Sequence, residues 1–262
     1  MPDFDPVRRQ RKAAKIVRAL QNELKSPGND SVTLLDIGCG SAHITDHFAD
    51  FLGSEGRVSA CDLIDTRSVR DDKFEFRLSP KNGTIPWQEN SFDVVVSNFV
   101  MEHVGPQTAQ QMHIREIARV LKPGGFCYLA VPNSWCVREA HTFLWFVTWM
   151  PEAWQEPYVC WRTKRKRFGT WTPSRRSVRR MCRHVGLNLR ATTIDTMRDY
   201  AALEPVGRLT RWICRSPTLL LRSLMGMVPS MTFILEKPRE TARENHKDFT
   251  NQQPSQLHHS QT

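Results

Sequence analysis

The sequence lacks the features of a membrane-spanning, secreted or zinc-binding protein. No stretch reaches the roughly 18 to 20 apolar residues needed to cross a bilayer, and the N-terminus lacks the apolar core of a signal peptide. The seven cysteines are odd in number and widely spaced, with no C-x-x-C pair and no histidines at zinc-ligand intervals. We therefore expect reduced thiols, no metal site and a cytoplasmic location.

The sequence also has no internal repeat, which excludes solenoids and propellers. Its 262 residues are 40% hydrophobic and 24% charged, a composition that excludes collagen-like, low-complexity and wholly disordered chains. The length suits one compact domain with insertions.

Acidic residues are scarce in the second half of the chain. Residues 1–133 contain 16 Lys/Arg against 17 Asp/Glu, whereas residues 134–262 contain 21 against 10. Within residues 162–222 the counts are 16 against 3. A solvated charged face is the simpler explanation, but a field of this size favours an anionic partner.

Short apolar runs alternate with helical patterns along the chain. Strands are predicted at 32–37, 57–61, 74–78, 92–97, 126–131, 189–194 and 231–235, and helices at 5–25, 42–52, 109–121 and 172–184, with a helical hairpin at 205–228. The alternation predicts an α/β, Rossmann-like doubly wound seven-stranded sheet, mostly parallel with an antiparallel last strand. A ligand site is expected at the carboxyl ends of the strands.

The composition divides the chain into three parts. An N-terminal helix lies within residues 1–30, a main domain covers 31–237, and the polar segment 238–262 is predicted to be a disordered tail. Insertions at about 134–171 and 205–228 interrupt the main domain, and six of the eight tryptophans fall in the first of them. We expect these insertions to form a helical cap, rich in aromatic and basic residues, over the site.

The most specific local pattern is a buried strand that runs into a turn containing Gly38 and Gly40. Glycines let the backbone approach a ligand closely, although a lone G-x-G is as often a tight turn without a ligand. About 20 residues further on, Asp62 follows the second strand, where a carboxylate can accept hydrogen bonds from both hydroxyls of a ribose. The pair therefore indicates a nucleoside-containing ligand.

Four blocks in order resemble the class I S-adenosylmethionine-dependent methyltransferases, and within them the group that includes ubiquinone/menaquinone-biosynthesis and related small-molecule methyltransferases. The blocks are LLDIGCG, CDL, IPWQENSFDVVVSNFVMEHV and EIARVLKPGGFCYLAVPN, and they cover roughly residues 33–133. A dinucleotide-dependent dehydrogenase more usually has a third glycine where His43 stands.

The resemblance implies S-adenosylmethionine as the cofactor and assigns a role to each matching residue. Gly38, Cys39 and Gly40 would face its methionine part, Asp36 would help to hold the amino group, Asp62 would bind the ribose, Leu63 would pack on the adenine, and Asn98 would face the reacting methyl. Two positions depart from the family. Ala42 replaces a glycine that is expected to permit close helix-to-strand packing, and Ser79, Lys81 or Asn82 replaces the usual adenine-binding acid.

Methyl transfer is an in-line displacement in which the cofactor carries the activation, so no dedicated nucleophile is required. For a hydroxyl acceptor, Glu102 and His103 are the candidates for a general base, although both have a purely structural explanation as well. His43, His47 and His141 are weaker candidates.

The second half suggests the acceptor. The apolar segments 143–150 and 219–228, too short to span a bilayer, lie next to basic runs and are typical of helices in an anionic headgroup layer, or else of an ordinary lid and core helix. We expect a methyltransferase acting on a small-molecule or lipid-linked acceptor, peripherally attached to a membrane. The alternatives are an RNA (tRNA) methyltransferase, because basic runs interleaved with tryptophan also suit RNA, and a non-catalytic cofactor-binding scaffold.

Overall fold

The computed structural model describes residues 6–24, 31–69, 72–136, 142, 144–164, 169–203, 206–223 and 228–239. Of the predicted disordered tail, only residues 238–239 are described. His141 and residues 165–167, which belong to the basic region 162–222, also lie outside the described residues.

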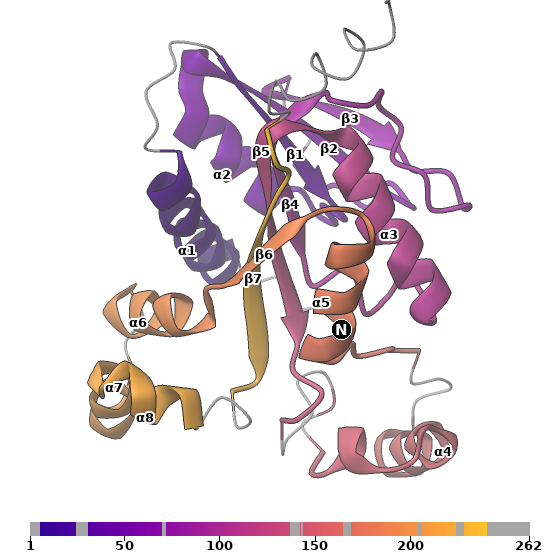
Figure 1. Cartoon of the computed structure of the whole chain (residues 1–262), viewed down its shortest axis with the longest axis vertical. Helices are drawn as coiled ribbons and strands as arrows, with labels where there is room; N and C mark the ends of the chain where they lie inside the picture. The colour runs from indigo at the N-terminus through magenta and orange to yellow at the C-terminus, as the bar shows by residue number, and fades with distance from the viewer. Residues whose placement is uncertain are drawn as a thin grey trace, which may run out of the picture.

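Seven strands form one sheet in the order β3-β2-β1-β4-β5-β7-β6 (Figure 1). They are β1 (Val32–Ile37), β2 (Gly56–Asp62), β3 (Phe74–Leu78), β4 (Phe92–Asn98), β5 (Leu121–Pro132), β6 (Asn188–Ala191) and β7 (Ser230–Glu236). The pairs among β1 to β5 are parallel, whereas β7 runs antiparallel to both β5 and β6. The predicted mixed sheet with an antiparallel last strand is confirmed.

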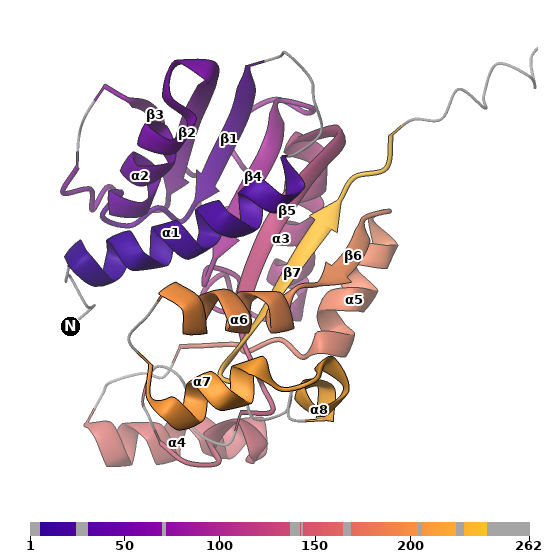
Figure 2. The ribbon, with the colours of Figure 1, turned by 90° about the vertical axis from the view of Figure 1, so that its left-hand side faces the viewer.

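Helices cover both faces of this sheet (Figures 1 and 2). The α-helices are α1 (Pro6–Glu23), α2 (His43–Leu52), α3 (Gln107–Val120), α4 (Glu152–Thr163), α5 (Arg175–His184), α6 (Thr193–Leu203), α7 (Arg208–Arg215) and α8 (Thr218–Ser223). Short 3-10 turns follow at η1 (Gly53–Glu55) and η2 (Val147–Trp149). The sheet side chains on one face pack with α1 and α2, and those on the other face pack with α3 and α5.

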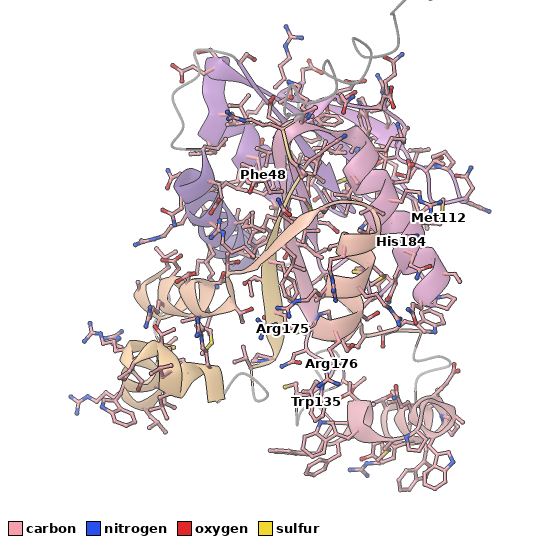
Figure 3. All side chains as sticks on the ribbon, in the orientation of Figure 1. Phe48, Met112, Trp135, Arg175, Arg176 and His184 are labelled. Atoms are coloured by element: carbon pink, nitrogen blue, oxygen red, sulfur yellow. The ribbon has the colours of Figure 1, made fainter. Side chains whose placement is uncertain are left out.

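The central strands are apolar on both faces because both faces are covered. Along β1 and β4, Leu34 and Val94 join the core layer beside α2, which Phe48 fills. Leu35 and Val95 join the opposite layer. Figure 3 shows this arrangement, with Phe48 inside the molecule and Met112 and His184 on the α3 and α5 side.

The register brings the ends of three strands together. Ile37 at the end of β1 pairs with Cys61 of β2 on one side and with Ser97 of β4 on the other. The turns that follow β1, β2 and β4 therefore open at the same edge of the sheet, where parallel α/β sheets bind their ligands.

The predicted strand at 189–194 is too long. Strand β6 ends at Ala191, and α6, which the sequence pattern did not reveal, begins at Thr193. The Thr193 hydroxyl accepts a hydrogen bond from the Thr232 amide (3.1 Å) and donates one to the Thr232 carbonyl (3.2 Å). At Thr193 the side chain, in place of the backbone, bonds to β7. The backbone pairing of the sheet therefore ends at Ala191, and the chain continues as helix α6.

The two insertions lie at one end of the molecule, beyond the carboxyl ends of the parallel strands (Figures 1 and 2). The first contains η2 and α4, and the second contains the short helices α7 and α8, both of which pack against α6. Among the described helices, none is both long enough and apolar enough to cross a bilayer.

Candidate active site

The turn after β1 is built by three residues with left-handed backbone conformations, Gly38 (φ 69°), Gly40 (φ 54°) and Ala42 (φ 64°). A Cβ at Gly38 would lie 2.5 Å from Val100 Cγ2, so packing requires glycine there. A Cβ at Gly40 would meet nothing within 4 Å. The open space beside Gly40 is what a ligand approaching the backbone needs.

The expectation for Ala42 is incomplete. Its side chain is buried, as close packing predicts, but its backbone is left-handed, a conformation that costs an L-residue roughly 1–2 kcal/mol and glycine much less. The glycine that the resemblance implies at this position would therefore relieve backbone strain as well as crowding.

Asp62 bridges this turn to the end of β2. One carboxylate oxygen accepts the Gly40 amide (2.8 Å) and the other accepts the amide of Leu63 (2.7 Å). Beside it, Leu63 and Ile64 are 57% and 68% exposed, which leaves an apolar surface next to the carboxylate. A carboxylate and an apolar surface in this order suit a ribose followed by a flat base.

Of the three proposed replacements for the adenine-loop acid, Ser79 lies beside Asp62, because its amide donates to the Asp62 carbonyl (2.8 Å). The Asn82 side chain accepts hydrogen bonds from the amide and the hydroxyl of Thr84 (3.0 and 2.8 Å). Asn82 thus closes its own turn, whereas Ser79 is held directly against the end of β2.

Asp36 is buried inside β1, and its carboxylate accepts the Thr45 hydroxyl (2.6 Å), which ties α2 to the strand. Burial raises the pKa of Asp36 to about 7, against the lowering effect of the Thr45 hydrogen bond and with an added contribution from the charge of Asp62. The carboxyl group of Asp36 therefore changes between its protonated and ionised forms near neutral pH.

Glu102 and His103 lie in the turn between β4 and α3. The Glu102 side chain is fully buried, and its backbone carbonyl accepts the amide of Trp171 (2.9 Å). His103 is half-exposed, with Nε2 3.9 Å from Glu102 Oε1. The predicted pair is close to the end of β4, at Asn98, but neither residue is among the described residues that line the cavity beside it.

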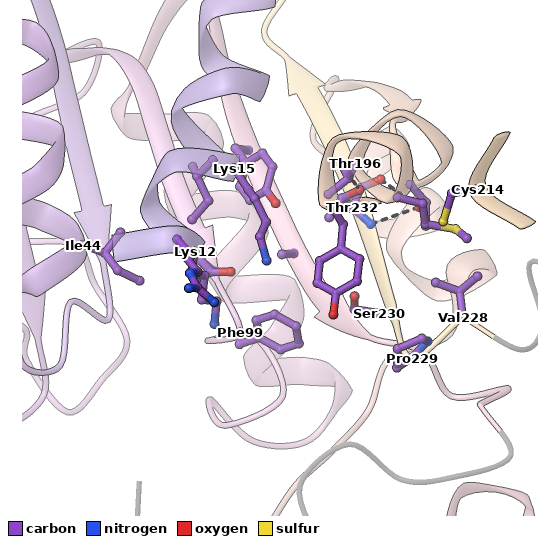
Figure 4. A pocket seen from close by; sticks show the side chains of 18 of the residues that line it. Lys12, Lys15, Ile44, Phe99, Thr196, Cys214, Val228, Pro229, Ser230 and Thr232 are labelled. Atoms are coloured by element: carbon purple, nitrogen blue, oxygen red, sulfur yellow. Dashed lines mark hydrogen bonds between the residues drawn. The ribbon is translucent and has the colours of Figure 1, made fainter. Parts of the chain in front are cut away.

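That cavity, of about 1120 Å³, lies between α1, the carboxyl ends of β4 and β5, and the later elements α6, α7 and β7 (Figure 4). Asn98 and Phe99 line it where β4 ends, and Tyr128 lines it from β5. It is therefore contiguous with the strand edge that carries the glycine turn.

Two lysines of α1 that sequence reasoning missed reach into the cavity (Figure 4). Lys12 Nζ lies 4.4 Å from the ring centroid of Phe99, and Lys15 Nζ lies 4.4 Å from that of Tyr200 in α6. The signal was present, since the two lysines are three residues apart and so share one face of a helix. It was missed because the helix was assigned outside the main domain.

Comparison with known proteins agrees with this geometry. Residues 35–129 match a family model described as "Methyltransferase domain". A ubiquinone biosynthesis O-methyltransferase of Maricaulis maris is 30% identical over 131 residues, which are 47% of this chain and 50% of that protein. A ubiquinone/menaquinone biosynthesis C-methyltransferase of Idiomarina loihiensis is 32% identical over 101 residues, 35% and 39% of the two chains. The chain thus spans half or less of these curated relatives.

The fold has solved counterparts. An S-adenosylmethionine-dependent methyltransferase from Mesorhizobium loti superposes with a TM-score of 0.56 at 13% identity, covering 86% of this chain and 99% of the other. At that identity the likeness concerns the fold alone. Support for methyltransferase activity comes from the family model and the curated relatives. Together these findings show a methyltransferase domain at residues 35–129, in a chain that is similar in part of its sequence to quinone-biosynthesis methyltransferases and in fold to an S-adenosylmethionine-dependent methyltransferase.

Proposed function

We propose that this protein transfers a methyl group from S-adenosylmethionine to a small-molecule or lipid-linked acceptor bound in the cavity beside β4. The observation that carries the proposal is the contiguity of two features. The cavity reaches Asn98 and Phe99 at the end of β4, and β4 pairs directly with β1, whose end carries the glycine turn. A cofactor on the turn and an acceptor in the cavity would meet at this point.

The residues at the turn fit the cofactor. Gly40 leaves open space beside its backbone, Asp62 offers a carboxylate for the ribose hydroxyls, and the exposed Leu63 offers a surface for the adenine. Ser79 follows β3 at the same edge. When bound, S-adenosylmethionine supplies a methyl group on a sulfonium centre, which is already activated for displacement.

The remaining task of the protein is alignment. Asn98 and Phe99 would position the acceptor atom in line with the methyl group, and the surrounding helices would exclude water, which is the larger part of catalysis when the leaving group is already activated. For an acceptor that loses a proton, Glu102 and His103 are the proposed general bases. Both lie in the turn after β4, within five residues of Asn98.

The end of the molecule near the cavity supports attachment to a membrane. On α7, Leu209 and Trp212 are 70% and 67% exposed and alternate with exposed arginines, and on α4 Trp154 and Trp161 are 68% and 73% exposed. Aromatic side chains mixed with cations suit the headgroup layer of an anionic bilayer. The names of the curated relatives, which concern ubiquinone and menaquinone biosynthesis, agree with a lipid-linked acceptor.

The first test is to incubate the purified protein with methyl-labelled S-adenosylmethionine and a whole-cell extract, and to count label in the solvent-extractable, RNA and protein fractions. We expect label in the solvent-extractable fraction. Label in RNA would replace the proposal with the RNA methyltransferase alternative, and cofactor binding without any label would favour a non-catalytic scaffold.

A second test examines the cofactor residues. Asp62→Ala should weaken binding of S-adenosylmethionine by roughly 1.5–3 kcal/mol, because it removes charge-assisted hydrogen bonds. Calorimetry measures this change. The control is Asp65→Ala, which removes a nearby carboxylate that pairs with Arg67 on the surface and should leave the affinity within about twofold. Unchanged affinity in Asp62→Ala would contradict the ribose assignment.

A further inference from the structure

The charged residues that line the cavity beside β4 are all cationic among the described residues. Four cationic residues of α1, Arg9, Arg11, Lys12 and Lys15, line it, and none of the described residues that line it is acidic. The carboxyl groups of Asp36 and Glu102 act electrostatically on Lys12 from outside the lining. The cationic side chains therefore dominate the surface that an occupant would touch.

The two lysines stand on one wall of the cavity, one helical turn apart, and each contacts an aromatic ring. Burial lowers the pKa of Lys12 to about 8, with Arg9 and Lys15 adding to the effect and Glu102 opposing it. Burial disfavours the charged form of Lys12, and a nearby anion favours that form. An anionic group between Lys12 and Lys15 would therefore stabilise the charged form of Lys12.

The opposite wall is uncharged and partly apolar. Met197 of α6, Ile213 of α7 and Val228 before β7 supply its apolar surface, and Figure 4 shows Val228 and Cys214 across the cavity from Lys12 and Lys15. Three threonines that also line this wall hydrogen-bond to one another, Thr193, Thr196 and Thr232. The volume of about 1120 Å³ exceeds what a small polar anion would fill. The lining thus presents a cationic wall that faces an uncharged, partly apolar wall.

We propose that the methyl acceptor is an anionic amphiphile whose carboxylate or phosphate group is held by Lys12 and Lys15 and whose apolar part lies against Met197, Ile213 and Val228. This inference rests on the proposed function, because it names the chemical class of the acceptor. With the anion near Phe99, the acceptor would be anchored beside the end of β4, where methyl transfer is proposed to occur.

Binding of two probes of equal chain length tests the proposal. Decanoate and decanol, in the presence of S-adenosylhomocysteine and below the concentrations at which they aggregate, should bind the wild-type protein with affinities that differ at least tenfold in favour of decanoate. Lys15→Met should reduce the ratio to within twofold, and Lys15→Arg should keep most of it. The control is Arg115→Met, which removes an exposed cation from α3, on the other face of the sheet, and should leave the ratio unchanged.

A competing role for these cations is to hold the carboxylate of S-adenosylmethionine. Binding of S-adenosylhomocysteine is therefore measured for the wild-type protein, Lys12→Met and Lys15→Met, with thermal unfolding to confirm that each variant is folded. Equal binding of the two probes to the wild-type protein, or loss of cofactor binding in Lys15→Met with decanoate binding intact, would overturn the proposal. If the wild-type protein binds S-adenosylhomocysteine in either case, only the acceptor class fails, and the label-transfer test decides the proposed function; if it does not bind S-adenosylhomocysteine, the proposed function fails too.

Discussion

His113 is a buried titratable residue whose protonation links the stability of the fold to pH. Its ring lies on α3 under the sheet, with Nε2 2.9 Å from the hydroxyl of Ser97 on β4. Burial lowers the pKa of His113 to about 4. In the unfolded chain the ring has its ordinary pKa of about 6.5. The folded form therefore resists a proton that the unfolded form accepts.

This difference predicts how stability changes with pH. Because the folded pKa is depressed, the neutral ring favours folding fully above pH about 6.5, and the advantage is lost as the pH falls towards about 4. Relative to His113→Gln, the wild-type protein should lose up to about 3 kcal/mol of unfolding free energy across that range.

Urea unfolding of both proteins at several pH values measures the difference. Comparison with the variant is needed because Asp36, with a raised pKa, has the opposite effect: its contribution to stability falls as the pH rises from about 4 to about 7. Parallel curves for the two proteins would contradict the assignment of the pH dependence to His113.

Residues that repeat a known pattern were predictable, and residues that depend on tertiary contacts were not. The glycine turn and Asp62 were identified from their spacing, and the structure brings Gly40 and Asp62 into direct contact. Lys12 and Lys15 were missed although their spacing places them on one helix face, because the sequence does not show that α1 packs beside β4 and α6, which are far from it along the chain.

At the scale of the element, α7 is the clearest candidate for a membrane contact. Its buried side carries Cys214, and its outer side presents Trp212 and Leu209 among arginines. Trp212→Ser should reduce binding to vesicles that contain anionic phospholipid by roughly tenfold, because it removes the largest exposed apolar side chain of α7.

Vesicle flotation measures this binding. Met112→Ser, on the exposed side of α3 at a distance from α7, is the matched control and should bind as the wild-type protein does (Figure 3). Equal flotation of Trp212→Ser and the wild-type protein, or weak flotation of both on anionic vesicles, would count against a membrane role for α7.

Elements with a regular hydrophobic period were predicted well, and irregular ones were not. The predicted strands at 32–37 and 74–78 agree with β1 and β3 to the residue. Helix α4 was predicted only as part of a helical cap, without bounds, because it is rich in exposed tryptophan and has Pro157 in its interior, so no apolar stripe marks it. Helix α6 was hidden because residues 192–194 continue the apolar and β-branched pattern of the strand before them.

At the scale of the whole molecule, the sheet is completed by strands outside the segment that matches the family model. Strand β7 pairs along β5 from Phe126 to Pro132, and β5 is buried on both faces there. Residues 1–133 alone would leave this apolar strand as an open edge. They should therefore fail to unfold cooperatively in urea and should aggregate, whereas residues 1–239 should show a single transition.

Circular dichroism during urea unfolding distinguishes the two cases. The longer chain is a suitable reference because Lys237 donates hydrogen bonds to the carbonyls of Ala118 and Leu121 (2.8 and 2.7 Å), which fastens the end of β7 to the α3–β5 junction. Cooperative unfolding of residues 1–133 would show that the later strands are dispensable.

The turn that precedes α2 lies inside residues 35–129, whereas most of the cavity wall is formed by segments on either side of them. Of the described residues that line the cavity, only Ile44, Asn98, Phe99 and Tyr128 lie within residues 35–129, and the others belong to the flanking segments. Under the proposed function, mutations in those flanks would alter which molecule is accepted while leaving Gly40 and Asp62 intact. The specificity of such a protein can change through substitutions in its flanking segments. Chimaeras that exchange α1 and residues 193–230 between relatives would test whether these segments carry the specificity with them.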